Sequence, residues 1–533
     1  MSQDHIDRTL ALLARTPGWA ALQTSRDDCD TETVAAVLDT ANGFAQTELA
    51  DLGARADRQG CRLEQGRVRV PDGYGAAWQA CAQNGWIALD LPEDVGGSGL
   101  PHTVYAAAMP LFERHATPFM MGVGATRSAA HMLKAQAAPD LAAQWVPRLA
   151  SGDWAATICI SEPGAGSDVG RIRSRATRDG DIWRVTGEKI WISFGDHDMA
   201  ERIGHCLLAR TGDAPGTRGL SLFLVPSTRA DGTPNGVSVV RIEEKLGMHG
   251  SPTCAMAFED AEAHLIGEEN RGLPQLFTMI ELMRLQTGCQ GLGLATLACE
   301  IAEGYAQERL QGGRPDAPPV PIASHPDVHR MLSGMRARTE ALRAAILELS
   351  TLLDLSRQTG PKSDEAALVA FLLPLVKNFG GAEGFETAND AIQVLGGAGY
   401  TQEWPVERAL RDARVLTIYE GTTGIQALDL LTRRVWANRH GLDLFLARAT
   451  AETADHPAAA AVIAGYAALA EDVAAQPHTE DALAGAEAFL RATWFAVCAW
   501  MGTRLDPQEA RPLYAAAAAR LALLRAEALP DSA

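Results

Sequence analysis

The stretch 416–430, LTIYEGTTGIQALDL, places one carboxylate, Glu420, between a short apolar run and a predicted helix start. The positive end of a helix dipole lowers the pKa of such a carboxylate, whereas desolvation by apolar neighbours raises it. A bound apolar ligand that excludes water would therefore make Glu420 a strong base. The same residues also fit a solvated loop glutamate followed by a helix cap at Thr422 or Thr423, so the rest of the chain must decide.

Two further motifs could meet a flat polar ligand. Residues 160–167, ISEPGAGS, end a predicted strand in a glycine-rich turn whose N–H groups and hydroxyls could contact an anion or a ring edge. In residues 187–193, GEKIWIS, the two-residue alternation of a strand puts Trp191 and Ser193 on one side. Each motif alone is equally consistent with a turn or with a core aromatic residue beside a satisfied serine.

Length, charge and cysteine content limit the classes of function. A chain of 533 residues is too long for one core, and at roughly 150 residues per domain it predicts three or four domains. The formal net charge of -19 disfavours nonspecific binding to nucleic acid or to anionic membranes, which need a basic face. Nine cysteines without a C-x-x-C pair indicate neither a disulfide framework nor a zinc site, and they favour a reducing compartment.

The N-terminus, MSQDHIDRTLALLART, lacks the basic region, apolar core and cleavage site of a secretory signal. No apolar run of membrane-spanning length is evident by inspection. We therefore expect a cytoplasmic protein without membrane insertion.

The pattern of hydrophobic periodicity along the chain predicts an α+β fold that is mainly α. Residues 1–150 are helix-like, residues 151–266 form short β-rich segments of an antiparallel sheet domain, and the helix period returns in 267–437 as a four-helix bundle. Residues 438–533 are a further alanine-rich helical domain, expected to be a solvated appendage in which acidic residues outnumber basic ones.

Five motifs in order resemble the acyl-CoA dehydrogenase family over roughly residues 75 to 435. The first two are described above, and the others are Glu281-x-x-Arg284, the QVLGGAG run 393–399 and the YEGT run 419–422. The C-terminal extension and the residues that follow Glu420 look most like those of the larger bacterial branch that includes 3-methylmercaptopropionyl-CoA dehydrogenase. The resemblance implies the same N-terminal helical, middle β and C-terminal bundle domains, with FAD between the β domain and the bundle.

The resemblance also implies a reaction. Glu420 would remove the α-proton of an acyl-CoA thioester while the β-hydrogen leaves as hydride to flavin N5, which gives a trans-2-enoyl-CoA. The thioester carbonyl would be polarised by the Glu420 backbone N–H and a ribityl hydroxyl of FAD.

The remaining site residues are implied by position in the family motifs. Contacts to FAD would come from Ile158, Ile160, Ser161, Trp191 and Ser193 at the ring, from Ser167 near the pyrophosphate or CoA, and from Thr422. In a neighbouring subunit, Arg309 would reach the FAD pyrophosphate, with Gln393, Gly396 and Gly397 near the adenosine end. Contacts to the acyl-CoA would come from Ser167, Glu281, Arg284, Tyr419 and Gly421. A simple surface ion pair is the alternative for Glu281 and Arg284, since they lie one helical turn apart.

Two positions depart from the family pattern. The aromatic residue expected after Arg309 is missing from ERLQGGR, and Gly424 stands where glutamine is common. Both weaken the adenine-side contacts and leave the role of Glu420 intact.

The resemblance implies an electron-transferring flavoprotein as electron acceptor and a homo-oligomer, most simply a dimer because of the extra C-terminal domain. Two alternatives stay open. An acyl-CoA oxidase would pass electrons to oxygen, and a flavin-containing stress or DNA-associated protein would need a basic C-terminal region, which this chain lacks.

Overall fold

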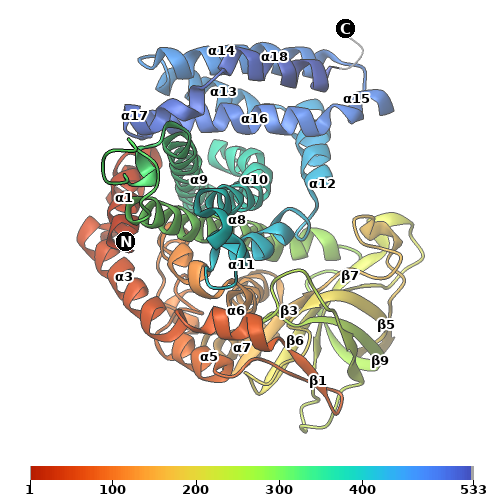
Figure 1. The fold of residues 1–533 in the computed structure, drawn as a ribbon. Coiled ribbons are helices and arrows are strands. Elements are labelled where there is room, and N and C mark those ends of the chain that lie inside the picture. The colour runs from red at the N-terminus through yellow and green to blue at the C-terminus, as the bar shows by residue number, and fades with distance from the viewer. Residues whose placement is uncertain (1, 530–533) are drawn as a thin grey trace. The chain divides into compact units, whose positions relative to one another are not determined.

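The computed structural model describes residues 2–529, and the chain divides into two compact units (Figure 1). The β unit contains Gly43–Leu100 and His115–Met283, and the helical unit contains Met1–Asn42, Pro101–Arg114 and Arg284–Ala533. Three helices run through both units, namely α3 (Thr31–Phe44), α6 (His102–Gln136) and α8 (Gly272–Glu308). The fold is mainly helical with one large sheet, as the sequence predicts.

The β unit surrounds its sheet with short helices. Its helices are α4 (Leu52–Gln59), α5 (Tyr74–Gln83) and α7 (Pro139–Ala150). Its strands are β1 (Arg62–Glu64), β2 (Arg67–Arg69), β3 (Trp154–Cys159), β4 (Arg175–Asp179), β5 (Ile182–Ser193), β6 (Arg202–Arg210), β7 (Leu220–Pro226), β8 (Val237–Ile242) and β9 (Thr253–Ile266). The β1–β2 hairpin interrupts the region that the sequence predicts to be all helical.

The seven-stranded sheet closes on itself. The strands follow the order β3-β6-β4-β5-β9-β7, β8 pairs with β9, and β7 pairs with both β9 and β6. Most pairings are antiparallel, as expected, but β3 and β4 each pair in parallel with β6. Closure leaves an inner and an outer face, and both faces need apolar residues.

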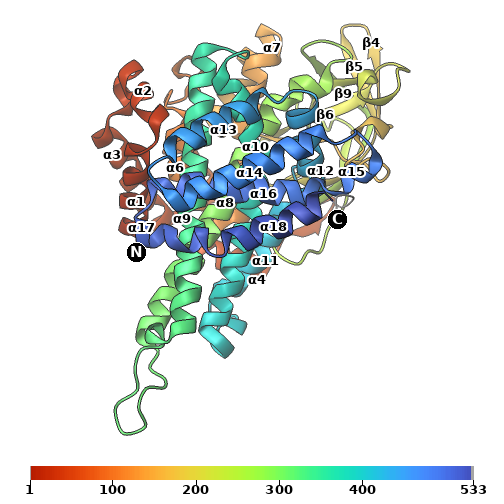
Figure 2. The same ribbon diagram turned by 90° about the horizontal axis from the view of Figure 1, so that it is seen from above.

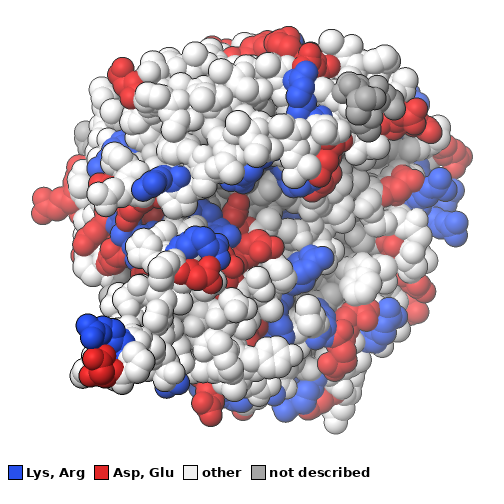
Figure 3. Space-filling view, turned by 45° about the horizontal axis from the view of Figure 1, so that its top comes forward, with Lys and Arg blue, Asp and Glu red and all other residues white. Residues whose placement is uncertain are grey.

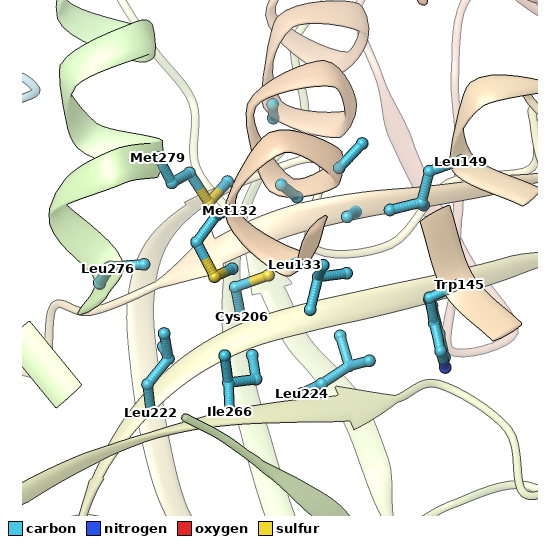
Figure 4. Close-up of a cluster of buried hydrophobic side chains, with 14 of the residues drawn as sticks. Met132, Leu133, Trp145, Leu149, Cys206, Leu222, Leu224, Ile266, Leu276 and Met279 are labelled. Atoms are coloured by element: carbon cyan, nitrogen blue, oxygen red, sulfur yellow. The ribbon is translucent and has the colours of Figure 1, made fainter. Parts of the chain in front are cut away.

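Successive side chains of strands β6 and β7 point alternately to the inner and the outer face, so these strands supply apolar residues to both faces. Leu207 and Phe223 point into the interior of the sheet, where they meet Val185 of β5. Cys206 and Leu222 point outward to a second core with helices α6, α7 and α8, which Figure 4 shows in close-up. This second core fixes β3: Ile158 of β3, and Ile160 just after the strand, pack at the edge of the core.

The helical unit consists of long bundle helices and a C-terminal layer. Its further helices are α1 (Ser2–Ala14), α2 (Pro17–Ser25), α9 (Pro326–Thr359), α10 (Asp364–Leu395), α11 (Val406–Ala413), α12 (Thr423–Leu428), α13 (His440–Glu452), α14 (Pro457–Ala475), α15 (Glu480–Ala484), α16 (Ala486–Met501), α17 (Pro507–Ala510) and α18 (Ala517–Ala528). Local signals start the long ones: Pro326 opens α9, and Ser363 caps α10 by accepting from the Ala366 N–H.

Helices α8 and α10 cross at unusually close range because glycines line both sides of the crossing. A Cβ on Gly291 would lie 1.8 Å from the carbonyl oxygen of Gly380, and one on Gly288 would lie 2.8 Å from Val376. On another side of α10, a Cβ on Gly381 would lie 2.7 Å from that of Leu416, in the 3-10 turn η8 (Arg414–Thr417). The segment that leads to Glu420 is thus held against α10.

The C-terminal helices form a layer in which α14, α16 and α18 pack side by side (Figure 2). Helix α16 also packs against α9 and α12. Trp494 of α16 stacks on Phe379 of α10 at 4.9 Å between ring centroids, and its Nε1 donates to Glu383 at 2.8 Å. The prediction of a solvated appendage is therefore wrong for α16, which is buried almost throughout.

Two helical segments of the described residues are long and apolar enough to cross a membrane by length and composition, Asp364–Tyr400 and α14. The sequence expectation that no such run exists is corrected to that extent. In the first segment, 72% of the apolar window is buried inside the protein, as in a core helix, so the finding is weak evidence for a membrane. On the face shown in Figure 3, acidic and basic side chains are intermingled.

Replacing Gly291 by alanine tests the helix crossing. The added Cβ would collide with the Gly380 backbone, which cannot rotate away, so we expect a lower unfolding midpoint and a cost of about 1–3 kcal/mol or more. Gly304→Ala on the same helix is the matched control, since no atom lies within 4 Å of its Cβ position. Alanine there should be neutral or stabilising by up to about 1 kcal/mol. Equal midpoints for the two variants would contradict the close crossing.

Candidate active site

Glu420 lies in a left-handed turn of the helical unit. Its φ is 54° and that of Gly421 is 93°, in the short segment between η8, which ends at Thr417, and α12. Thr422 is the N-cap of α12, and its hydroxyl accepts from the Ile425 N–H at 3.4 Å. A left-handed conformation costs an L-residue roughly 1–2 kcal/mol, and such strain concentrates at functional sites.

Three side chains hold the carbonyl groups of this turn. Arg284 Nε of α8 donates to the Glu420 carbonyl oxygen at 3.3 Å. Gln426 Nε2 of α12 donates to the same oxygen at 3.0 Å and to the Gly421 carbonyl at 3.2 Å. Lys377 Nζ of α10 donates to the Gly421 carbonyl at 2.7 Å. The turn is thereby tied to three helices, and we call these three side chains the carbonyl clamp.

The clamp also sets the electrostatics of Glu420, whose side chain is partly exposed. Desolvation raises the pKa of Glu420, and the positive charges of Arg284 and Lys377 oppose that rise. Burial lowers the pKa of Lys377 to about 7, and the charge of Glu420 opposes that fall. Burial thus favours the neutral form of Glu420, Arg284 and Lys377 alike. The carboxylate and the two cations favour one another's charged forms, whereas Arg284 disfavours the charge of Lys377.

Residues on either side of Glu420 are anchored as well. The Tyr419 hydroxyl donates to Gln290 Oε1 of α8 and bonds with Thr287, and burial raises its pKa well above the ordinary value. The Thr423 hydroxyl donates to Asn378 Oδ1 of α10 at 2.7 Å. Backbone freedom at Glu420 is therefore small, while its carboxylate remains accessible.

In the β unit, the predicted ring-contacting residues gather where β3 and β5 end. The Thr157 hydroxyl donates to the Ser193 carbonyl at 2.6 Å, and the Ile190 N–H donates to the Ser161 carbonyl at 2.9 Å. Trp191 has a φ of 63° and is 60% exposed, an unusual combination for the largest side chain. An indole is held open to solvent here at a cost to the backbone.

Strict alternation does not explain the position of Trp191. It would put Trp191 on the same face as Lys189, which is fully buried. The pairing of β5 with β9 shifts register between Lys189 and Ile192, and this bulge turns the indole outward. Trp191 and Ser193 then flank the buried Ile192.

A buried ion pair pins the glycine-rich turn to β5. Lys189 Nζ donates to Glu162 Oε1 at 2.8 Å and to the carbonyls of Ile160 and Leu208 at 2.9 and 2.8 Å. Glu162 also accepts from the Arg173 and Ser174 N–H groups. Burial raises the pKa of Glu162, but the charge of Lys189 and these hydrogen bonds outweigh burial, so the pKa is lowered. All three donors of the ammonium are satisfied, which makes the pair structural.

Comparisons with known proteins assign consecutive parts of the chain to one family. Family models for the N-terminal, middle and C-terminal domains of acyl-CoA dehydrogenases match residues 31–153, 157–261 and 270–435. The 3-methylmercaptopropionyl-CoA dehydrogenase of Ruegeria pomeroyi is 40% identical over 79% of this chain and 74% of its own length. The chain belongs to the acyl-CoA dehydrogenase family. The resemblance drawn from five motifs, including that to the bacterial branch, is thus confirmed.

Other relatives agree with this assignment. The mitochondrial short-chain specific acyl-CoA dehydrogenase of Homo sapiens is 31% identical over 78% of this chain and 96% of its own length. Caenorhabditis elegans ACDH-11, solved in complex with C11-CoA, superposes with a TM-score of 0.80 over 93% of this chain and 89% of its own at 22% identity, which shows the fold alone. The protein is an FAD-dependent acyl-CoA dehydrogenase.

The β unit fits the flavin ring of FAD. The Trp191 face is exposed, and the hydroxyls of Ser161, Ser167 and Ser193 have no hydrogen-bond partner among the described residues. No atom lies within 4 Å of a Cβ built on Gly164 or Gly166, so the turn is open. An exposed aromatic face beside free hydroxyls and an open turn suits a flat, polar-edged ring.

The residues expected to reach the pyrophosphate and adenosine end of FAD in a neighbouring subunit lie at the tips of two bundle helices. Arg309 directly follows α8, and Gln393 lies in the last turn of α10; both are exposed. Gly396 and Gly397 are exposed in the 3-10 turn η7 (Gly396–Tyr400), where Gly396 has a φ of 62°. Their exposure leaves them available to a ligand or subunit, and their role remains a prediction. Glu281 lies one turn before Arg284 on α8 and is half-buried.

Sequence reasoning missed Lys377 and Gln426 of the clamp. Lys377 carried a signal, because it is the one charged residue between Glu365 and Glu383 in an otherwise apolar helix. A lone charge in such a run needs a partner. Gln426 carried none, since a glutamine near a helix start is commonplace. The pair of Glu162 and Lys189 was also missed, although both lie inside motifs that were singled out.

Proposed function

We propose that Glu420 is the base of an acyl-CoA dehydrogenation. It would take the α-proton of the thioester while the β-hydrogen leaves as hydride, and the product would be a trans-2-enoyl-CoA. The observation that carries this proposal is the desolvated carboxylate in a fixed left-handed turn. FAD, when bound, supplies the acceptor for the hydride.

The raised pKa of Glu420 suits this role. A base works best when its conjugate acid is nearly as weak as the group it deprotonates, and burial moves a carboxyl in that direction. The positive charges of Arg284 and Lys377 oppose this rise in pKa and so favour the ionised carboxylate that a base needs. An acyl chain that displaces water from the partly exposed carboxylate would strengthen the base further.

The backbone of Glu420 supports a second role. Its N–H has no acceptor among the described residues, whereas its carbonyl accepts from Arg284 and Gln426. A fixed, unused donor beside a base can polarise the thioester carbonyl and so acidify the α-proton. The clamp would orient this N–H by holding the opposite side of the same turn.

The remaining residues would bind ligand. Trp191, Ser161 and Ser193, with Ile158 and Ile160, would hold the flavin ring. Ser167 and Thr422 would contact its polar part or CoA, and the exposed Arg309, Gln393, Gly396 and Gly397 would contact FAD of a second subunit. Arg284, beside Glu420, would act on the base as well as on the acyl-CoA, to which Glu281, Tyr419 and Gly421 would also contribute.

We propose acyl-CoA thioesters of short chain, including thioether acids, as substrates. Relatives at 30% identity or more include proteins named for 3-methylmercaptopropionyl-CoA, butyryl-CoA and short-chain acyl-CoA, and one named for broad specificity toward linear acyl-CoA. An electron-transferring flavoprotein would be the acceptor. We propose a homodimer, because the exposed residues at the adenosine end need a second subunit.

Replacing Glu420 by glutamine tests the base. The amide keeps the shape of the side chain but cannot take the proton, so anaerobic flavin bleaching by acyl-CoA should slow by at least about 10³-fold. A panel of short, long, branched, aryl and thioether acyl-CoAs should bleach the wild type, the short and thioether members fastest. Glu403→Gln, at an exposed position of the same unit, should bleach at the wild-type rate. A Glu420→Gln enzyme that bleaches normally would refute the assignment.

Oxygen dependence tests the acceptor. A dehydrogenase should turn over slowly in air with acyl-CoA alone and at least about tenfold faster when an electron-transferring flavoprotein is added. Rapid peroxide formation without a carrier protein would instead identify an acyl-CoA oxidase.

A further inference from the structure

Lys377 is a fully buried lysine within the apolar stretch of α10. Its Nζ has three donors, yet among the described residues it has one acceptor, the Gly421 carbonyl at 2.7 Å. By contrast, the buried Lys189 of the β unit has all three donors satisfied. A buried ammonium with one hydrogen bond must rely on a nearby negative charge.

The charged groups that face Lys377 come from two other elements. Glu420 of the turn attracts it, and Arg284 of α8 repels it. Beyond Arg284, Asp429, Arg433 and Arg434 lie in the π-helical segment η9 (Asp429–Trp436), where Asp429 pairs with both arginines. Glu420 is therefore the carboxylate on which the charge of Lys377 depends.

The position of Lys377 is set by the helix crossing. It lies one turn before Gly380 and Gly381, where α10 contacts the α8 backbone and Leu416. Both ends of its interaction are consequently fixed, the ammonium by α10 and the turn by η8 and the clamp. A rigid tether can hold a strained backbone that would otherwise relax.

We propose that Lys377 is a positioning residue for the base: its ammonium ties down the Gly421 carbonyl and keeps Glu420 ionised until the substrate delivers its proton. This inference rests on the proposed role of Glu420. In the step itself, the α C–H bond breaks, the proton goes to a Glu420 carboxylate oxygen, and Lys377 neither gains nor loses a proton.

The proposal has two separable parts, tether and charge. Lys377→Met removes both the donor and the charge at similar length. Lys377→Gln keeps an N–H donor but no charge. Lys362→Met is the matched control, since it removes an exposed lysine of the same unit.

The test is the pH dependence of anaerobic flavin bleaching by saturating acyl-CoA, from pH 5.5 to 9.5. Loss of a neighbouring positive charge raises the pKa of a carboxylate, so the acid limb should move upward by at least about one pH unit in both Lys377 variants. Burial puts the pKa of Lys377 at about 7, so the wild type loses this charge above neutral pH. At alkaline pH, the bleaching rates of Lys377→Gln and the wild type should therefore converge. The rate of Lys377→Met should stay about tenfold lower, because this variant lacks the hydrogen bond to the Gly421 carbonyl.

An acid limb that stays at the wild-type pH in both variants would overturn the proposal, even if their rates fall, because a merely structural lysine predicts a lower plateau alone. Lys362→Met should match the wild type throughout. Failure of the proposed function looks different: either the wild type is not bleached by any acyl-CoA, or Glu420→Gln bleaches normally. Bound flavin and an unchanged thermal midpoint show that each variant is folded.

Discussion

The site depends on a left-handed backbone at Glu420 that three side-chain donors hold in place. The carbonyl groups of the turn accept hydrogen bonds from Arg284, Lys377 and Gln426, whereas the Glu420 carboxylate and N–H remain available to a ligand. Each donor comes from a different helix, so the turn follows the geometry of the bundle. The glycine crossing of α8 and α10 brings two of these helices close enough, and α16 of the C-terminal layer packs against the third, α12.

This arrangement costs stability in favour of chemistry. Burial disfavours the charged forms of Glu420 and Lys377. The left-handed backbone of Glu420 destabilises the fold by a further amount of roughly 1–2 kcal/mol. The gain is a carboxylate that is both a stronger base than one in water and fixed in direction. The buried ion pair of Glu162 and Lys189 contrasts with it, because the Lys189 ammonium has all three donors bonded, to Glu162 and to two backbone carbonyls.

Local sequence predicted what local interactions decide. The order of helical, β and helical regions and the helix cap at Thr422 follow from periodicity and side-chain chemistry near in sequence. The contacts that sequence did not predict are long-range: the parallel pairing of β3 with β6, the bulge that turns Trp191 outward, and burial of α16 by stacking of Trp494 on Phe379. Lys377 lies 44 residues before Gly421, so its role appears only when α10 packs beside the turn.

Chemical rescue tests most directly whether the carboxylate at position 420 is the base. Glu420→Gly suits a backbone φ of 54° and leaves space for a small acid. The account predicts very slow anaerobic flavin bleaching by acyl-CoA in this variant, with a rate that rises in proportion to added acetate and follows the ionised form of acetate as pH changes. A rate that is independent of acetate, or close to the wild-type rate without it, would contradict the account.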